Sequence, residues 1–119
     1  MMAVSEGRRV YIIRARFEST STPVFKIGVS SGKSSVDRLL QLERSFFMKY
    51  RYIFFAAIKR DRPAPNAFAI ETELHHRFAD KRYYHDKPID GKDEWFKVEE
   101  DELLRAYDDL LPLQDKKKP

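Results

Sequence analysis

Residues 9–16 (RVYIIRAR) and residues 24–29 (VFKIGV) are the stretches that decide the fold class of this chain. Both are rich in β-branched and aromatic residues, which favour β-strands. The segment between them is polar and ends at Pro23, as is typical of a connecting loop. We therefore predict that the domain begins with an antiparallel β-hairpin.

The pattern after the hairpin predicts a helix and then a third strand. Ser34 or Ser35 can cap a helix that runs to about residue 47. Residues 50–58 are apolar on both faces, which is typical of a central strand. The residues at helical spacing that we expect to form the inner face of the helix are Val36, Leu39, Leu40, Glu43 and Phe47.

The rest of the chain predicts two more helices with a short strand or turn between them. Asn66 can cap a helix over residues 67–78, and residues 99–111 form another with apolar residues on one face. Residues 94–98 form the short strand or turn. The fold class is therefore α+β: a small antiparallel sheet, made of the N-terminal hairpin and a central strand, flanked by helices.

Composition points to one domain in a reducing compartment. The chain has 119 residues, 42% of them hydrophobic, so we expect one domain over residues 1–112 and a basic, disordered tail over residues 113–119. The absence of cysteine excludes a disulfide framework and thiolate zinc sites. Without a long apolar run or a signal core, we expect a soluble cytoplasmic protein that does not contact membranes. The net charge of +4 suits a protein that approaches phosphate groups.

The predicted hairpin brings two polar side chains together. A six-residue loop sets the register in which Tyr11 lies opposite Gly28. Tyr11 and Lys26 are then diagonal neighbours on one face, and the glycine leaves open space beside the tyrosine. Because a nearby cation favours the ionised form of a phenol, the pair is suited to activating or orienting a water molecule. Composition alone favours a core aromatic for Tyr11 and a solvent-facing residue for Lys26.

The second predicted helix carries a carboxylate on its apolar face. Steps of about 100° per residue place Glu71 near the centre of this face and His75 on its rim. A buried carboxylate needs a cation, a metal ion or strong hydrogen-bond donors, because burial without a partner is costly. A structural ion pair with an arginine is the alternative explanation. The apolar residues of the face are Ala67, Ile70, Leu74 and Phe78.

Arg38 and the histidines are less distinctive. Arg38 lies in the first turn of its helix, where anions are favoured, but off the main apolar stripe, so it is either a phosphate ligand or a surface residue. His75 and His76 are adjacent and point in different directions. Because no third ligand follows at a suitable spacing, a histidine metal cluster is not predicted.

Five motifs in a fixed order resemble the GIY-YIG nuclease superfamily. The resemblance covers residues 9–98. Within the superfamily, the sequence is similar to the branch of small phage and bacterial proteins that have KIG in the second motif and an ExxLHxxF helix. Each motif alone is weak, but the ordered set is specific. The motifs are VYII around Tyr11, FKIGVS at residues 25–30, DRLLQL at 37–42, ETELHHRF at 71–78 and DEWFKV at 93–98.

The resemblance implies a divalent-metal-dependent endonuclease that hydrolyses phosphodiester bonds of nucleic acid, DNA more than RNA, with Mg²⁺ or Mn²⁺ as cofactor. It implies that Tyr11 activates or orients the attacking water and that Arg38 steadies the phosphate. Glu71 is implied to bind the metal ion, and His75 to assist water or phosphate binding. Lys26 replaces the usual second tyrosine, and it can contact phosphate or favour the ionised form of Tyr11.

Two other classes of function are consistent with the residues. A nucleic-acid-binding module that lost cleavage through the Lys26 replacement would show salt-sensitive DNA binding alone. A protein-interaction or inhibitor domain would expose aromatic anchors, for which Tyr83, Tyr84 and Trp95 are the candidates. A domain this small has little surface for base readout, so high specificity would need a homo-oligomer or a partner protein.

Overall fold

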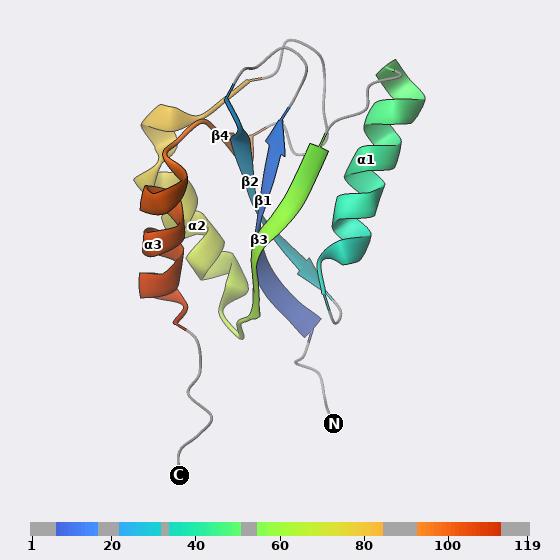
Figure 1. Cartoon of the computed structure of the whole chain (residues 1–119). Helices are drawn as coiled ribbons and strands as arrows, with labels where there is room; N and C mark the ends of the chain where they lie inside the picture. The colour runs from blue at the N-terminus through green and yellow to red at the C-terminus, as the bar shows by residue number, and fades with distance from the viewer. Residues whose placement is uncertain (1–6, 17–21, 32–33, 51–54, 85–92, 113–119) are drawn as a thin grey trace.

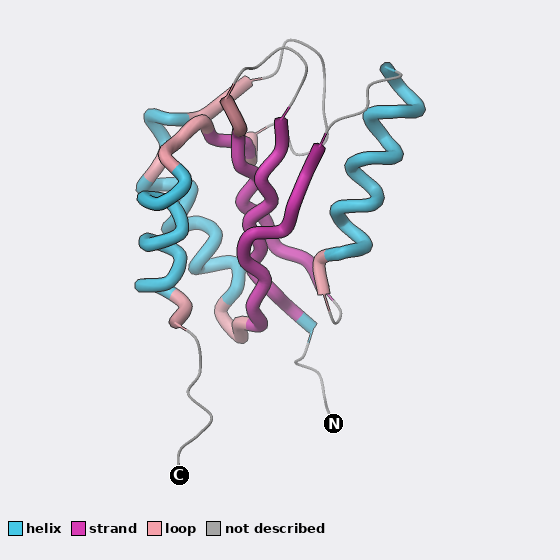
Figure 2. Tube along the Cα trace, in the orientation of Figure 1, coloured by secondary structure: helices cyan, strands magenta, loops and turns pink. Residues whose placement is uncertain are grey.

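The computed structural model describes residues 7–16, 22–31, 34–50, 55–84 and 93–112. The predicted α+β class is confirmed: an antiparallel sheet with the strand order β3-β1-β2-β4 lies between helices (Figures 1 and 2). The tail predicted over residues 113–119 lies outside the described residues. In chain order the elements are β1 (Arg8–Arg16), β2 (Val24–Ser31), α1 (Val36–Tyr50), β3 (Phe55–Pro63), α2 (Ala67–Arg77), the 3-10 helix η2 (Ala79–Lys81), β4 (Trp95–Phe96) and α3 (Glu100–Leu110).

Strands β1 and β2 form the predicted hairpin in the predicted register, with Tyr11 opposite Gly28. Because successive side chains of a strand point to opposite faces, β1 supplies both sides of the sheet. Val10 and Ile12 point to the side covered by α2 and α3. Tyr11 and Ile13 point to the other side, which α1 covers. The hairpin register therefore decides which residues enter each core.

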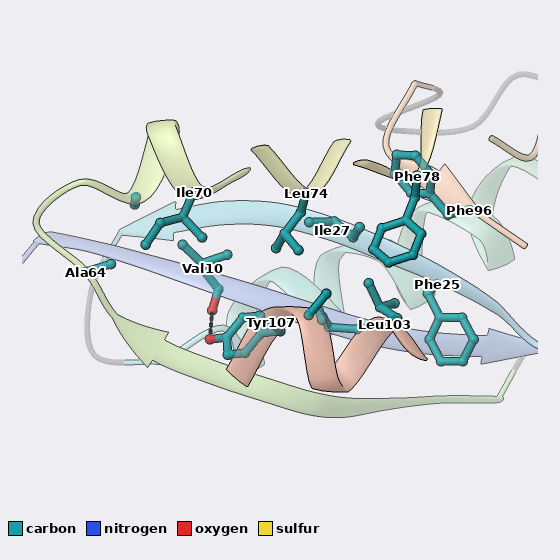
Figure 3. Packing of buried hydrophobic residues seen from close by; sticks show 13 residues of the cluster. Val10, Phe25, Ile27, Ala64, Ile70, Leu74, Phe78, Phe96, Leu103 and Tyr107 are labelled. Atoms are coloured by element: carbon teal, nitrogen blue, oxygen red, sulfur yellow. Dashed lines mark hydrogen bonds between the residues drawn. The ribbon is translucent and has the colours of Figure 1, made fainter. Parts of the chain in front are cut away.

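Each face of the sheet has its own hydrophobic cluster. On the side of α2 and α3, apolar side chains from both helices pack on β1 and β2 (Figure 3). The Tyr107 hydroxyl donates a hydrogen bond to the Val10 carbonyl oxygen at 2.8 Å, which satisfies the polar end of a buried aromatic residue. The other side is covered by α1 (Figure 1). Leu42 and Phe46 of this helix pack with the sheet and with Trp95.

The strand predicted as central is instead an edge strand. Among the described strands, β3 pairs with β1 alone, and its side chains are half-buried rather than buried on both faces. It also extends to Pro63, past the predicted end at residue 58. The added residues are mostly charged, and at the sheet edge these charges have partners: Arg60 pairs with Asp108 at 2.9 Å. Residues 51–54 of the predicted strand lie outside the described residues.

The predicted inner face of the first helix is wrong in part. Leu39 packs against the sheet as predicted, together with Leu42 and Phe46. Leu40 and Phe47, also predicted to face inward, are exposed, Leu40 by 54%. The helix carries two apolar stripes, and helical periodicity alone cannot tell which one packs. Its start is capped as predicted, since the Ser34 hydroxyl accepts a hydrogen bond from the Val36 amide at 3.2 Å.

The other two helices follow the prediction. α2 buries Ala67, Ile70 and Leu74, and Asn66 occupies its N-cap position without a side-chain capping hydrogen bond. α3 packs through Leu103, Ala106 and Tyr107.

Within the residues that the structure describes, no helix has the length and apolar character needed to cross a bilayer.

Candidate functional site

Lys26 and Tyr11 form a buried pair on the sheet face that α1 covers. Lys26 is 0% exposed, and its Nζ donates a hydrogen bond to the Tyr11 hydroxyl oxygen at 2.7 Å. The same Nζ lies 5.0 Å from the centroid of the Tyr11 ring. The predicted neighbourhood of the two side chains is confirmed. The solvent-facing alternative for Lys26 is wrong, because the strand face that carries it is covered by α1.

Gly28 makes room for the Tyr11 hydroxyl. A Cβ atom built on Gly28 would lie 2.6 Å from Cζ of Tyr11 and 3.1 Å from Nζ of Lys26, and it would also overlap the hydroxyl oxygen. A side chain at this position would therefore push the tyrosine away from the strand. The glycine of the KIG motif is thus required by the close approach of an aromatic ring to the backbone.

Glu94 is a member of this site that the sequence prediction missed. It directly precedes β4, whose Trp95 lies opposite Lys26 in the sheet. Its carboxylate accepts a hydrogen bond from Lys26 Nζ and forms an ion pair with it. Its backbone carbonyl accepts a hydrogen bond from the Ile27 amide at 3.0 Å. The DEWF motif contains this acidic residue, but the pairing of β2 with β4 is needed to show that it meets Lys26.

Glu71 reaches the same region from α2. β4 pairs with Phe25 and Lys26 of β2, and the Glu94 carbonyl accepts a hydrogen bond from the Ile27 amide. In the described structure the edge of β2 is therefore open beyond Ile27, and α2 reaches this edge through His75. The Glu71 side chain is 16% exposed. Burial raises the pKa of its carboxyl above the ordinary value of 4.5; His75 lowers this pKa, Glu94 raises it and Lys26 lowers it. Glu71 is therefore close enough to Lys26 and Glu94 for their charges to change the pKa of its carboxyl.

The alternative explanation for Glu71 is an ion pair with an arginine, but no arginine pairs with it among the described residues. The hydrogen bonds and ion pairs of the described residues include one contact of its carboxylate, with His75 Nε2 at 3.8 Å, and this is an ion pair when the histidine is protonated. The carboxylate is thus half-buried without a strong donor. This is the arrangement in which a bound cation would be most favourable.

His75 attaches α2 to the open edge of β2. Its Nε2 lies 2.9 Å from the Ile27 carbonyl oxygen, and since a carbonyl can only accept, Nε2 donates this hydrogen bond. The ring also packs on Phe96, with 5.1 Å between centroids. Glu71 lies one helical turn before His75, so this contact helps to hold the carboxylate at the strand edge. Because Nε2 is engaged with the backbone, the contact with water or phosphate that the resemblance implied would have to be made by Nδ1 of His75.

Asp61 holds the start of α1 beside Tyr11. It lies opposite Tyr11 in the pairing of β3 with β1. Its Oδ2 accepts a hydrogen bond from the Ser35 backbone amide at 2.8 Å, and its Oδ1 accepts one from Nε of Arg9 at 2.6 Å. An acidic residue at a helix start is favourable, and here it also joins two elements.

Arg38 occupies the first turn of this anchored helix. Its Nη1 donates a hydrogen bond to Gln41 Oε1 at 3.1 Å. The arginine lines an open groove together with Ser30, which follows Gly28 on the same face of β2. The structure therefore brings Arg38 to the end of the sheet where Tyr11 and Gly28 lie. Its hydrogen bond within the described residues is to Gln41 and not to the Lys26–Tyr11 pair.

The donors around Glu71 fit a hard divalent cation with few protein ligands. Among the described residues, no group of three or more His, Asp or Glu side chains could hold a metal ion. However, Glu71 offers a half-buried carboxylate, and a second carboxylate, Glu94, lies within reach of its charge. Mg²⁺ commonly binds through one or two carboxylates and keeps several waters, so this donor set suits it better than it suits zinc.

The aromatic residues considered as partner anchors do not form one exposed patch. Trp95 is 0% exposed and belongs to the cluster that contains Tyr11. Tyr83 packs against the same cluster, and Tyr84 alone of the three is exposed. Packing rather than partner binding explains Trp95 and Tyr83.

Comparison with protein families matches residues 8–111 to the T5orf172 domain. The matched range contains every element of the sheet and every residue of the site described above. It identifies a nuclease-like, nucleic-acid-related type of domain. Searches among curated proteins and among solved structures found no match.

Proposed function

We propose that this protein, which belongs to the T5orf172 domain family, is a cytoplasmic endonuclease of the GIY-YIG type that hydrolyses nucleic-acid phosphodiester bonds with a divalent metal ion. DNA is the expected substrate rather than RNA. The observation that carries the proposal is the half-buried Glu71 carboxylate at the open edge of β2, beside the buried Lys26–Tyr11 pair. A half-buried carboxyl with a raised pKa beside a buried lysine is typical of functional sites.

Tyr11 is the residue that addresses the attacking water in this proposal. Lys26 donates to its hydroxyl oxygen, which leaves the tyrosine's own O–H group and a lone pair for a water molecule. Tyr11 can therefore orient the attacking water, because its remaining lone pair can accept a hydrogen bond from that water. Glu94 keeps the ammonium in place, and Gly28 keeps the ring close to the strand.

Arg38 and His75 have supporting roles. Arg38 presents a planar guanidinium, which can bind two phosphate oxygens at once. The anchoring of α1 through Asp61 and Ser35 sets where this guanidinium can reach. His75 is a positioning residue, because its Nε2 is engaged with the β2 backbone and its helix carries Glu71.

Glu71 would hold the metal ion, with water and phosphate oxygens as the other ligands. Bound Mg²⁺ or Mn²⁺ would neutralise charge on the phosphate and on the leaving oxygen. Because burial raises the pKa of Glu71 and Glu94 raises it further, the ionised carboxylate would be stabilised by a bound cation.

Nicking of supercoiled plasmid DNA in Mg²⁺ or Mn²⁺ tests this proposal. Glu71→Gln should lower the cleavage rate by about 100-fold or more, because a metal or electrostatic contact to the transition state is worth several kcal/mol. Glu73→Gln is the matched control: Glu73 lies on the same helix, is half-exposed and pairs with Arg77 at 3.3 Å. Equal rates for the wild type and Glu71→Gln would refute the assignment.

One observation favours a nucleic-acid-binding module without cleavage as the second candidate. Lys26 stands where related nucleases have a tyrosine, and its Nζ is already engaged by Tyr11 and Glu94. A site in this state could bind a phosphate backbone without activating water. Salt-sensitive binding of DNA with no cleavage in any divalent metal would identify this function.

A further inference from the structure

The groove lined by Arg38 contains side chains that the proposed reaction does not use. It is an open groove of about 410 Å³ between the first turn of α1, the end of β2 and the first turn of α2. The lining residues that matter here are Arg8, Ser30, Ser34, Asp37, Arg38 and Phe68.

Phe68 is an aromatic residue with no role in the core. It is 57% exposed, whereas Ala67 and Ile70 beside it are buried and pack α2 against the sheet. The guanidinium carbon of Arg8 lies 4.8 Å from the centroid of the Phe68 ring. One wall of the groove is therefore an exposed aromatic ring with the Arg8 guanidinium over one of its faces.

The polar lining of the groove suits a phosphate group. Arg8 and Arg38 bring two positive charges, against one negative charge from Asp37. The Oγ atom of Ser30 is buried and has no hydrogen-bond partner in the described structure. Because a buried hydroxyl is normally paired, this atom favours a ligand that offers hydrogen-bonding oxygens.

The groove is continuous with the candidate site along two elements. On β2, Ser30 follows Gly28 on the same face, about 7 Å further along the strand. On α2, Phe68 lies three residues before Glu71, which makes the two side chains neighbours on the helix surface. The two elements run in opposite directions, since His75 contacts Ile27 whereas Phe68 shares the groove with Val29. Going forward along β2 from Gly28 and going backward along α2 from Glu71 therefore both lead from the candidate site into the groove.

We infer that this groove binds an unpaired nucleotide next to the cleaved bond, with its base stacked on Phe68 and its phosphate held by Arg8 and Arg38. The inference rests on the proposed function for the position of the cleaved bond at Glu71. A base is free to stack on a side chain when it is not paired in a duplex, so the substrate class is a single-stranded segment. Stacking on an aromatic ring accepts any base, so the groove adds affinity without sequence preference.

Binding measured without cleavage tests the inference. Fluorescence anisotropy in EDTA would compare a labelled single-stranded oligodeoxynucleotide with a fully abasic strand of the same length and charge. The wild type should prefer the strand that carries bases. Phe68→Ala should weaken binding of that strand by about 5- to 150-fold and leave binding of the abasic strand unchanged.

The matched control is Phe55→Ala, which removes another exposed phenylalanine from β3, at the opposite edge of the sheet from β4. This variant should bind both strands as the wild type does. Equal melting temperatures of the two variants would show that Phe68→Ala remains folded. Equal base preference in the Phe68→Ala, Phe55→Ala and wild-type proteins overturns the inference, as does a wild type that binds neither strand.

The phosphate part of the inference has its own test. Arg8→Ala should weaken binding of both strands and reduce the slope of log affinity against log salt by about 0.7, the value for one phosphate contact on a single strand. Arg105→Ala, an exposed arginine on α3, should leave the slope unchanged. An unchanged slope in Arg8→Ala would remove this residue from the groove's function.

The binding and nicking experiments can fail separately. A base preference that depends on Phe68 in a protein that never cleaves would support the groove and refute the proposed reaction. Cleavage that depends on Glu71, with no base preference lost in Phe68→Ala, would support the reaction and refute the groove.

Discussion

The two faces of the sheet are built from alternate residues of the same strands, yet they bury different chemistry. The face under α2 and α3 buries apolar side chains, and the hydroxyl of Tyr107 there has a backbone partner. The face under α1 buries the Lys26 ammonium, and the Oγ atoms of Ser30 and Ser35 have no hydrogen-bond partner in the described structure. The first face provides stability, whereas the second retains polar groups that stability alone would not favour.

The largest effect on the apolar face should come from Leu74→Ala. Leu74 is 0% exposed in the centre of this cluster (Figure 3), so the cavity left behind should lower the free energy of unfolding by about 2–5 kcal/mol. Leu40→Ala, at an exposed position of α1, should change it by less than about 0.5 kcal/mol. Urea unfolding of both variants would measure the difference. Equal values would mean that α2 is not packed as described.

The next effect concerns the polar face. Gly28→Ala should displace the Tyr11 ring and lower the cleavage rate by about 100-fold, because small shifts of a reacting group have effects of this size. Gly7→Ala is the control, since a Cβ at that position would have no atom within 4 Å. Plasmid nicking and a melting curve for each variant would separate loss of activity from loss of fold. Full activity in Gly28→Ala would show that the position of Tyr11 is unimportant.

A smaller effect tests the hydrogen bond of the buried Tyr107 hydroxyl on the apolar face. Tyr107→Phe removes the hydrogen bond to the Val10 carbonyl and should lower the free energy of unfolding by about 0.5–1.5 kcal/mol. Tyr84→Phe alters an exposed tyrosine and should have no measurable effect. If Tyr107→Phe is as stable as the wild type, the hydroxyl is not needed to satisfy this face.

The smallest expected effect is a gain in stability. Burial raises the pKa of Glu71, so the folded state disfavours its ionised form, and the stability contributed by this carboxyl is lost as the pH rises through the raised pKa. Glu71→Gln stays neutral and should therefore melt at a higher temperature than the wild type at pH 7 without metal. The difference should disappear below the ordinary pKa of 4.5, where both side chains are neutral.

Added Mg²⁺ reverses this last comparison. The cation should raise the melting temperature of the wild type and leave that of Glu71→Gln unchanged, because binding to the folded state stabilises it. A wild type that is more stable than Glu71→Gln at pH 7 in EDTA would contradict the description of Glu71 as a carboxylate without a strong donor.

Local pattern was sufficient for part of the site. The loop length and the alternation of side chains predicted the Tyr11–Lys26 neighbourhood, since both are properties of one hairpin. Helical phase placed Glu71 near the centre of an apolar face, and burial raises the pKa of its carboxyl. Helical periodicity did not predict a functional role for Arg38. Where Arg38 lies depends on the start of α1, which the contact with Asp61 holds against the sheet.

The sequence by itself determined the hairpin register, the existence of three helices and the unusual position of one carboxylate, because each depends on residues close together in the chain. The tertiary structure alone decided that β3 lies at the edge of the sheet, which stripe of α1 packs, and that Glu94 meets Lys26 across 68 positions. Such contacts depend on how whole elements pack together. The repeating pattern within each element is compatible with more than one such arrangement.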